Sequence, residues 1–495
     1  MKTQYLIHNT MKLHGLYIKE YKILKDFRID FDNPISVLIG MNGSGKSTVL
    51  EVLAEIFSSA FLGLNGKVKK SKLVSKLVYN IVYSVYLKDI QEVVTVSLEK
   101  EEDAPFQVNI TLENTSNEAK EFKVSAKDLF PNKVVVYYSG WNEKMELIAS
   151  PHESDYEEKI RDFTKQYLDD TSNFDFNVNV ENLAHYPSLS ILYLKKKHFN
   201  MLASALFSTE FNFELNDFFE KNIPNIKLED LGIGIWLKKP HWAATHTKEK
   251  FWGTKGELLQ FLNLLDENAG SKNIKNYLYF GIEHWRKIKD FYGEEKKIFY
   301  LLNALDIAGL LDIVEPVFHK DQYPKLPIGL NDFSEGEQQL LLIKAINELL
   351  IEENTLCLFD EPDVYLHPKW QGEFIKNISE NNTENTQYVI TTHSTVMLSN
   401  LKDGALYRMK DGKAQYIENG YYGKGYENNL ENYFEVGSRN EEAAEELANL
   451  FQLIDEEKYS EATQVIDNLQ VKYPNEPELT RAQTLIALLQ EDDEI

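Results

Sequence analysis

The sequence predicts an α/β protein built around a buried sheet, and three observations carry that prediction. The apolar run Ile35–Ile39 leads into a glycine-rich segment, Gly40–Thr48, which a helical pattern follows. A second apolar run, Leu356–Phe359, ends in paired acids. Two further runs, Lys133–Tyr138 and Gln387–Ile390, also end in polar turns. Short, continuously apolar, β-branched runs are typical of strands buried on both faces.

Composition indicates a soluble globular chain. It has 495 residues, 43% hydrophobic and 26% charged, enough for two or three domains. Its one cysteine, Cys357, excludes an internal disulfide and favours a reducing compartment. Met1–Gly15 lacks the apolar core of a signal peptide, and no apolar run approaches the roughly 18 residues of a membrane span. We therefore expect a cytoplasmic protein that is not embedded in a membrane.

The net charge is strongly negative and unevenly distributed. It is 53 − 78 = −25, and residues 421–495 hold 5 basic against 18 acidic residues, a net of −13. This argues against a non-specific nucleic-acid coat, because such binding needs Lys and Arg to neutralise phosphates. The basic clusters at Lys67–Lys76 and Lys195–Lys197 are interpreted as solvated faces.

The N-terminal part predicts two short antiparallel strands and then a phosphate-binding loop. Leu16–Phe31 alternates in the manner of a strand pair. Gly40–Thr48 matches G-x-x-x-x-G-K-[ST] between a buried strand and an apolar helix, Val49–Phe57, the context that the motif requires. Glycines at 43 and 45 let successive N–H groups face one anion, Lys46 would reach the β- and γ-phosphates, and Ser47 would bind Mg²⁺. The expected nucleotide-binding residues here are Asn42, Gly43, Ser44, Gly45, Lys46, Ser47 and Thr48.

The next two regions are predicted from their alternation. Residues 77–126 predict an antiparallel meander, with strand-like segments at Leu77–Leu87, Val93–Leu98, Phe106–Leu112 and Phe122–Val124. From about 150 to 325 the pattern is irregular, with short helical pieces and one strand-like segment, Gly232–Leu237. The helical pieces expected there are Glu157–Leu168, Leu189–Phe207, Leu258–Leu265 and Glu295–Ala308. No heptad repeat of coiled-coil length is present. We interpret this region as an insertion whose histidines, His241, His246 and His319, are structural or exposed.

The segment Phe333–Gln339, which we call the signature turn, predicts a capped helix start. Ser334 is a natural N-cap, and Glu337 follows at the capping-box spacing. A helix start with Gly336 at its mouth is also suited to an anion, because it exposes N–H groups at the positive end of the helix dipole.

Further candidate site residues follow the ends of two predicted strands. Asp360 and Glu361 end a buried strand, where carboxylates are costly unless they have a task. Asp360 would hold Mg²⁺, and Glu361 would polarise a water molecule that attacks the γ-phosphate. His393 follows the strand Gln387–Ile390 and is placed to hydrogen-bond a phosphate. A turn leaving Lys133–Tyr138, at Ser139-Gly140, either joins this site or is an ordinary turn.

The last part of the chain predicts a helical tail. Glu441–Glu456, Ser460–Tyr473 and Glu478–Gln490 each carry an apolar helical face, which resembles one and a half tetratricopeptide-like units. One unit cannot stack into a solenoid, so the tail either packs on the core or presents a groove to a partner.

Taken in order, these motifs closely resemble the ATP-binding-cassette ATPases of the SMC, RecF and OLD type. The motifs that carry the resemblance are Gly40–Thr48, Tyr138–Asn142, Phe333–Gln339, Leu356–Pro362 with the following Asp363–Pro368, and Thr391–His393. The layout and helical tail look most similar to the ATPase subunit of Septu-type antiphage systems, some of which accompany retrons. The resemblance implies a P-loop sheet with an antiparallel β subdomain, a mostly helical insertion and a tetratricopeptide-like tail.

The resemblance also implies a mechanism. ATP with Mg²⁺ would lie between the P-loop of one copy and Ser334, Gly336 and Glu337 of another, in a homodimer or higher oligomer. Glu361 would be the catalytic base and His393 the switch histidine. Two departures matter: His367 stands where transporters usually carry an Asp, and the glutamine of the usual Q-loop has no clear equivalent around Trp141-Asn142.

We expect an ATPase that dimerises around ATP and regulates an associated HNH-type nuclease in antiviral defence, with DNA contact through that partner left open. The alternatives are an SMC- or RecF-like ATPase in DNA repair or DNA-end sensing, and a slow nucleotide sensor with little turnover. The expected domains are 1–150, the first half of the ATPase head; 151–325, the insertion; 326–420, the second half of the head; and 421–495, the partner-binding tail.

Overall fold

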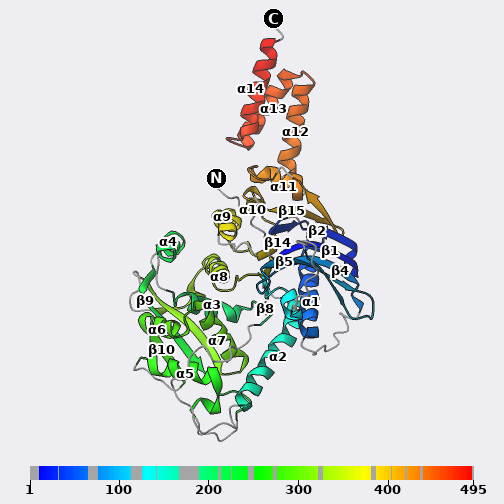
Figure 1. Ribbon diagram of the computed structural model, residues 1–495. Helices are drawn as coiled ribbons and strands as arrows, with labels where there is room; N and C mark the ends of the chain where they lie inside the picture. The colour runs from blue at the N-terminus through cyan, green and yellow to red at the C-terminus, as the bar shows by residue number, and fades with distance from the viewer. Residues whose placement is uncertain are drawn as a thin grey trace, which may run out of the picture. The chain divides into compact units, whose positions relative to one another are not determined.

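The computed structural model divides into two compact units, Met1–Gly423 and Lys424–Ile495 (Figure 1). It describes residues 11–31, 33–64, 76–112, 125–140, 142–166, 189–209, 213–223, 226–243, 250–270, 276–320, 327–380, 386–402, 404–418, 421–434 and 439–492. Sheets and helices alternate through the first unit, which confirms the expected α/β class.

A seven-stranded sheet forms the centre of the first unit. Its order is β16 (Lys413–Ile417), β15 (Ala405–Lys410), β3 (Ile35–Ile39), β14 (Thr386–Thr391), β13 (Thr355–Asp360), β7 (Lys133–Tyr138) and β8 (Ile191–Tyr193). Every pairing in it is parallel except β15 with β16. The four buried runs of the sequence are therefore neighbouring strands, and all of their carboxyl ends lie at one edge.

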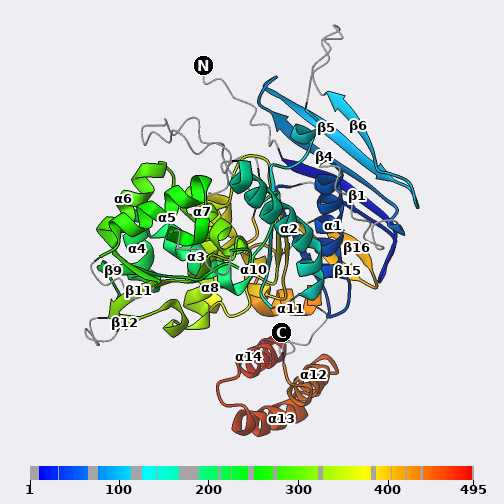
Figure 2. The same ribbon diagram turned by 90° about the horizontal axis from the view of Figure 1, so that it is seen from below.

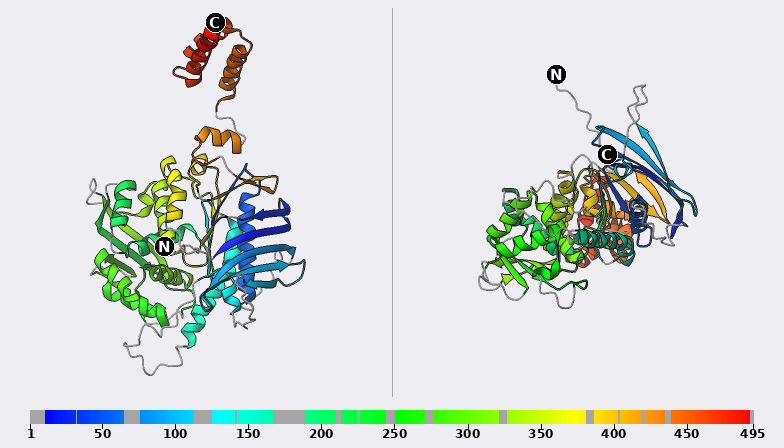
Figure 3. Two further views of the ribbon diagram at one scale, coloured as in Figure 1. Left: turned by 45° about the horizontal axis from the view of Figure 1, so that its top comes forward. Right: turned by 60° about the horizontal axis from the view of Figure 1, so that its bottom comes forward.

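A second, antiparallel sheet lies beside the first. Its order is β2 (Leu24–Asp30), β1 (Lys12–Tyr21), β4 (Tyr79–Leu87), β5 (Glu92–Lys100) and β6 (Gln107–Leu112). The predicted strand pair and three strands of the predicted meander are thus present, whereas Phe122–Val124 lies outside the described residues. The two sheets and α1 (Lys46–Leu64) share one apolar core. Figure 3 shows this sheet and the insertion on opposite sides of the central sheet.

Helix α1 corrects one expectation about apolar length. By length and composition its 19 residues pass the test for a membrane-spanning helix, with a mean hydropathy of 1.5. Its side chains Val49, Leu53, Ile56 and Phe57 are fully buried between the sheets. A helix covered by sheets on both sides needs apolar residues all round, so core packing accounts for its composition.

The insertion contains more sheet than the sequence indicated. Its helices are α2 (Glu143–Gln166), α3 (Lys196–Leu206), α4 (Phe213–Asn222), α5 (Gly256–Asn268), α6 (Ile282–Tyr292) and α7 (Glu295–Ile307), with the 3₁₀ turn Lys250–Gly253. They accompany a four-stranded sheet in the order β10 (Tyr277–Gly281), β9 (Ile226–Leu237), β11 (Leu311–Lys320) and β12 (Pro327–Ile328) (Figure 2). Only β9 was expected. The other strands are held by long-range pairing, which no local periodicity reveals.

One predicted helix in this region starts too early. Leu189–Phe207 was expected to be helical throughout, but Ile191–Tyr193 forms β8 and pairs in parallel with β7. All three β8 side chains are buried. A short apolar run is compatible with either structure by periodicity alone, and pairing with the edge of the central sheet selects the strand.

The remaining elements of the first unit connect and cover the central strands. They are the 3₁₀ turns Ala126–Leu129 and Leu330–Asp332 and the helices α8 (Glu335–Leu349), α9 (Pro368–Glu380) and α10 (Thr395–Ser399). Helix α8 begins at the signature turn, and α9 begins shortly after the paired acids. Both therefore start near the edge that carries the chemistry.

The second unit is helical. It consists of α11 (Tyr426–Phe434), α12 (Glu441–Asp455), α13 (Tyr459–Lys472) and α14 (Pro477–Asp492). Helices α12 to α14 bury a small core of their own, which includes Leu450, Ile466 and Ala482. The three predicted C-terminal helices are thus present, and they pack on one another.

Candidate functional site

Four strand ends converge at the carboxyl edge of the central sheet. Asp360, the last residue of β13, pairs in register with Thr391 of β14 on one side and with Tyr138 of β7 on the other. Thr391 in turn lies opposite Leu38 of β3, two residues before the P-loop. Strand β14 therefore separates the P-loop strand from the strand with the paired acids. This order places the His393 turn between them.

The P-loop holds the geometry that its glycines predict. Gly43 and Gly45 have φ values of 78° and 105°, in the region that favours glycine. Asn42 is exposed, Ser47 and Thr48 are half-buried in the first turn of α1, and Ser44 is buried. The Ser44 hydroxyl has no hydrogen-bond partner among the described residues. Such a group, next to the unpaired N–H groups of a helix start, suits an added anionic ligand.

Lys46 is enclosed by the site and uses all of its donors. Its side chain is 5% exposed. The Nζ atom donates to the carbonyl oxygens of Gly40 at 2.9 Å and Met41 at 3.4 Å, and it lies 2.9 Å from His393 Nε2. Burial lowers the pKa of Lys46, and the carboxylates of Glu361 and Asp360 oppose that shift. A phosphate would have to replace at least one of these three contacts.

The contact with Lys46 decides the tautomer of His393. An ammonium group has no acceptor, so Nε2 of His393 accepts from Lys46 and the proton of the neutral ring lies on Nδ1. Burial and the Lys46 charge hold the pKa of His393 below its usual value, against the pull of Glu361. Glu361 Oε1 lies 3.5 Å from the same Nε2. The imidazole thus lies between the P-loop cation and the predicted base.

Ser47 and Asp360 meet as the sequence predicts. The Ser47 hydroxyl donates to Asp360 Oδ1 at 3.0 Å, and the Thr391 hydroxyl donates to the same oxygen. Asp360 is 2% exposed, and burial raises its pKa although both hydroxyls oppose the shift. One hydroxyl and one carboxylate are hard oxygen ligands that fit Mg²⁺, which binds through few protein groups and takes the rest from phosphates and water. No group of three or more His, Cys, Asp or Glu residues that could hold a metal occurs in the described ranges.

Glu361 is turned out of the strand by its backbone. Its φ is 50°, a left-handed conformation that is strained for a non-glycine residue. The N–H of Glu361 donates at 3.1 Å to both the carbonyl oxygen and the hydroxyl of Thr391. These bonds hold the strained turn, and the Glu361 side chain remains 33% exposed towards the edge. Solvent access is what a base that activates water requires.

Sequence reasoning missed the glutamines that hold the turn after Glu361. Gln339 of α8 donates to the Pro362 carbonyl at 2.9 Å and accepts from the Tyr137 hydroxyl at 2.6 Å. Gln371 of α9 donates to the Leu366 carbonyl at 2.9 Å and accepts from Ser394, the residue after His393, at 2.8 Å. The one signal in the sequence was that both are polar residues in apolar helical patterns. Together the two glutamines connect helix α8, which starts at the signature turn, to the turn Glu361–Leu366 (the acidic turn) and to the turn Thr392–Ser394 (the histidine turn).

Asp363 adds a buried carboxyl to this turn. Burial raises its pKa to about 6, and a hydrogen bond with Thr392 opposes that shift. Its Oδ1 atom has no partner within the described part of the chain. The Thr392 bond is a further link between the acidic turn and the histidine turn.

The signature turn forms the predicted capping box. Ser334 Oγ accepts from the N–H of Glu337 at 3.3 Å, and the Glu337 carboxylate accepts from the N–H and the hydroxyl of Ser334, both at 2.8 Å. Over the described ranges, the hydrogen bonds of these two residues stay within the turn, while those of Lys46 stay within the P-loop and His393. Within the described residues, no hydrogen bond of Ser334, Glu337 or Lys46 therefore joins the signature turn to the P-loop of the same chain.

The loop after β7 has a structural task. Asn142 Oδ1 accepts from the N–H groups of Lys144 at 3.0 Å and Met145 at 3.2 Å, so it caps α2. Ser139 donates its N–H to the Asp360 carbonyl at 3.2 Å. Trp141 lies outside the described residues.

The other residues considered from the sequence lie away from this edge. Lys195 pairs with Glu146 and Glu153, each at 3.1 Å, and Lys197 pairs with Asp306, so both serve packing inside the insertion. His241 lies 3.8 Å from Glu157, and the cluster Lys67–Lys70 and Lys72 lies outside the described residues.

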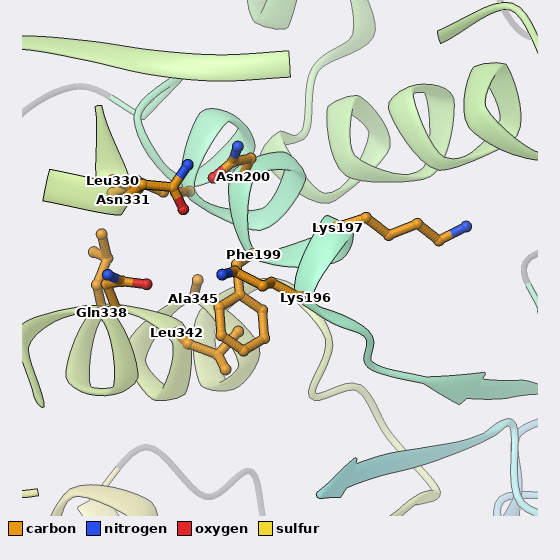
Figure 4. Close-up of a pocket in the computed structure, with 11 residues that line it drawn as sticks. Lys196, Lys197, Phe199, Asn200, Leu330, Asn331, Gln338, Leu342 and Ala345 are labelled. Carbon is orange, nitrogen blue, oxygen red and sulfur yellow. The ribbon is translucent and has the colours of Figure 1, made fainter. Parts of the chain in front are cut away.

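A pocket with about 620 Å³ of empty space, including open solvent, lies between α3 and α8. Figure 4 shows Phe199 against Leu342 and Ala345, with Lys196 extending towards Gln338 and Lys197 pointing away. The pocket joins the insertion to the signature helix but holds none of the groups of the carboxyl edge.

Comparison with known proteins identifies relatives. The family described as AAA ATPase domain matches residues 11–398. "Retron Vc95 probable ATPase" of Vibrio cholerae serotype O1 biovar El Tor is 23% identical over 424 residues, covering 80% of this chain and 73% of the relative. "Retron Ec83 probable ATPase" of Escherichia coli is 26% identical over 201 residues, covering 36% of this chain and 36% of the relative.

Among solved structures, the chain is similar to the recombination mediator protein RecF with ATP, at a TM-score of 0.35 and 14% identity, covering 84% of this chain and 100% of that one. It is also similar to an Smc head bound to the C-terminal winged-helix domain of ScpA, at a TM-score of 0.34 and 12% identity, covering 82% and 97%.

Proposed function

Because the chain belongs to the AAA ATPase domain family, we propose that it binds ATP at Gly40–Thr48 and hydrolyses it to ADP and phosphate. The observation that carries this is the convergence of Lys46, Ser47, Asp360, Glu361 and His393 within direct contact distances at one sheet edge. A positioned cation, hard oxygen ligands and an exposed carboxylate are the parts that phosphoryl transfer needs.

Each side chain has a defined task in this proposal. The P-loop N–H groups and Lys46 bind the triphosphate. Ser47 and Asp360 hold Mg²⁺, which would neutralise charge on the phosphates. Glu361 accepts a proton from the attacking water molecule. The oxygen of that water bonds to the γ-phosphorus, and the bond between the γ-phosphorus and the oxygen shared with the β-phosphate breaks, which releases ADP. Burial and the contact with Lys46 keep His393 neutral, with Nε2 unprotonated. When a γ-phosphate replaces the contact between Lys46 and His393, the imidazole can hydrogen-bond that phosphate.

We further propose that the site is completed by a second copy, whose Ser334, Gly336 and Glu337 face the γ-phosphate. The lack of a hydrogen bond between the two half-sites supports this, since neither Ser334 nor Lys46 finds a partner in the other motif over the described ranges. In the free chain the Glu337 carboxylate accepts hydrogen bonds from the N–H and the hydroxyl of Ser334. We therefore propose that Glu337 acts on the γ-phosphate indirectly, by positioning Ser334.

The variant Ser334→Asp is expected to bind ATP normally as a monomer and to lose ATP-dependent dimerisation. Aspartate caps a helix about as well as serine. It gives up the hydroxyl bond that Ser334 donates to Glu337, so we expect α8 to keep its start with the Glu337 carboxylate turned away, and the added charge to repel a phosphate. Sedimentation velocity with and without a non-hydrolysable ATP analogue measures the effect, and an unchanged melting temperature shows that the cap is intact. Undiminished dimerisation in this variant would rule out the trans role of Ser334.

The proposal extends to a partner: the ATP state controls an associated HNH-type nuclease in antiviral defence, and DNA is reached through that nuclease. Two relatives are named as probable ATPases of retrons, and we take this as support for a role of this chain in a retron. The second unit supports a docking role, because it buries its own core and residues 424–495 carry 5 basic against 18 acidic residues.

Deletion of residues 424–495 is expected to abolish co-purification with the nuclease encoded by a neighbouring gene and to leave ATP binding intact. The reason is that Met1–Gly423 is compact by itself and holds the whole P-loop edge. Affinity capture of co-expressed proteins measures the association, with ATP binding as the folding control. Nuclease captured equally by both forms would exclude the second unit as the docking element, and DNA cleavage by the full chain alone would overturn the partner hypothesis.

A further inference from the structure

A groove opens beside the signature turn, and part of its wall comes from the insertion. The residues that line it belong to α4, to the signature turn, to the turn after the paired acids and to the start of α9. They are Lys221, Ser334, Gly336, Tyr365, Leu366, His367, Lys369 and Trp370. We call this the signature groove. It holds about 1070 Å³ of empty space, including open solvent, which is room for a triphosphate.

The insertion is fixed in this wall by direct contacts. Trp370 of α9 donates its indole N–H at 2.9 Å to Asn222, which follows Lys221 in α4. A side chain at Gly336 would place its Cβ 2.9 Å from the Tyr365 carbonyl oxygen and 3.1 Å from the Trp370 ring. Glycine at 336 therefore permits a close approach between the signature turn and Trp370. Trp370 in turn contacts α4 through its hydrogen bond to Asn222. The position of Lys221 is thus coupled to the signature turn.

The polar groups of the groove are mainly donors. Lys221 and Lys369 are both exposed there, and the Nζ atom of Lys221 forms an ion pair with Asp217 Oδ2 at 2.7 Å. His367 Nδ1 accepts the N–H of Lys369 at 3.2 Å, so in the neutral ring the proton is on Nε2 and that atom donates. The signature turn carries two carboxylates. That of Glu337 is turned back onto the capping box, and that of Glu335 is exposed and is not among the residues that line the groove. Two ammonium groups, an imidazole N–H and a helix start suit an anion with several oxygens.

We infer that Lys221 and Lys369 bind the triphosphate of an ATP molecule that a second copy of this chain presents, so that the insertion reads the nucleotide state of the partner. This rests on the proposed ATP-dependent dimer. The anion comes from another copy because none of the residues that line the groove belongs to the P-loop of the same chain, and Lys46 makes its described contacts within that P-loop and with His393. Lys221 belongs to the insertion, which gives that region a direct part in the composite site.

The test uses the full chain with Lys221→Gln, Lys369→Gln and the matched control Lys287→Gln, which removes an exposed lysine from α6 of the same insertion. Binding of a labelled non-hydrolysable ATP analogue is measured at concentrations where the chain is monomeric. Dimerisation with the analogue is then titrated by sedimentation velocity at low and high salt.

We expect unchanged analogue binding by the monomer and dimerisation weakened on the order of tenfold by each groove variant, because a two-fold dimer loses the contact twice. The loss should shrink at high salt, since the contact is between exposed charges. Lys221→Arg should retain most of the dimerisation, and Lys287→Gln should match the wild type.

Two results would overturn the inference while the proposed function stands. The first is dimerisation by Lys221→Gln and Lys369→Gln as tight as that of the wild type. The second is analogue binding by the variant monomers that is weakened as much as dimerisation, which would place the lysines on the nucleotide of their own chain. Failure of the wild type to dimerise with the analogue would instead overturn the proposed dimer and this inference together.

Discussion

Replacing Glu361 with glutamine is expected to lower ATP hydrolysis on the order of 10²–10⁴-fold while ATP binding is retained. Glutamine has the same shape, and the N–H bonds to Thr391 that hold the turn at φ 50° belong to the backbone, so the site keeps its geometry. The amide cannot accept the proton of the attacking water. Phosphate release at saturating ATP measures turnover, and equilibrium dialysis measures binding.

The same variant should accumulate as an ATP-bound dimer, because ATP is held but not consumed. Glu373→Gln is the matched control, since it makes the same chemical change on an exposed position of α9 and should leave turnover unchanged. Turnover by the variant as fast as that of an actively hydrolysing wild type would remove Glu361 as the base. A wild-type rate as slow as that of the variant would favour the nucleotide-sensor alternative.

Replacing Lys46 with alanine is expected to weaken ATP binding on the order of 10²-fold or more, because charge-assisted hydrogen bonds to phosphate are lost and no other side chain replaces them. Hydrolysis and ATP-dependent dimerisation should be lost with it. His393 also loses the donor that keeps Nε2 unprotonated, so its pKa should move upward in the variant. Equilibrium dialysis with labelled ATP checks the affinity, and NMR titration of the imidazole checks the pKa.

Lys402→Ala is the matched control for this variant. Lys402 is exposed and precedes β15, whose first residue, Ala405, pairs with Ser36 near the start of β3, so it lies at the amino end of the strands. Removing its charge should leave ATP affinity unchanged. Normal affinity in Lys46→Ala, or an equal loss in Lys402→Ala, would show that Gly40–Thr48 is not the phosphate-binding loop.

The sequence predicted the parts of the site that depend on local pattern. Gly45 needs a left-handed backbone, Lys46 follows it at the helix start, and Ser334 and Glu337 have the spacing of a capping box; each requirement is met within a few residues of chain. The buried strands ending at Ile39 and Asp360 were also visible, because strands covered on both faces are continuously apolar. The roles that we assign to these residues remain predictions.

The structure added what depends on distant residues. The strand order that sets β14 between β3 and β13 explains why Thr391 serves both Asp360 and Glu361, and no periodicity encodes that order. Gln339 and Gln371 looked like ordinary helix residues until their amides were found on the turn after Glu361.

The sequence by itself determined the chemistry available to this protein: a phosphate-binding loop, a carboxylate pair and an anion-suited helix start. Only the tertiary structure decided which of these groups meet in one chain and which face outward. Capping and loop geometry are settled over a few residues. Strand order, the sheet in the insertion and the place of Lys221 beside the signature turn come instead from contacts between residues that lie far apart in the sequence. For that reason the P-loop was evident at once, and the groove for a second molecule became visible only in three dimensions.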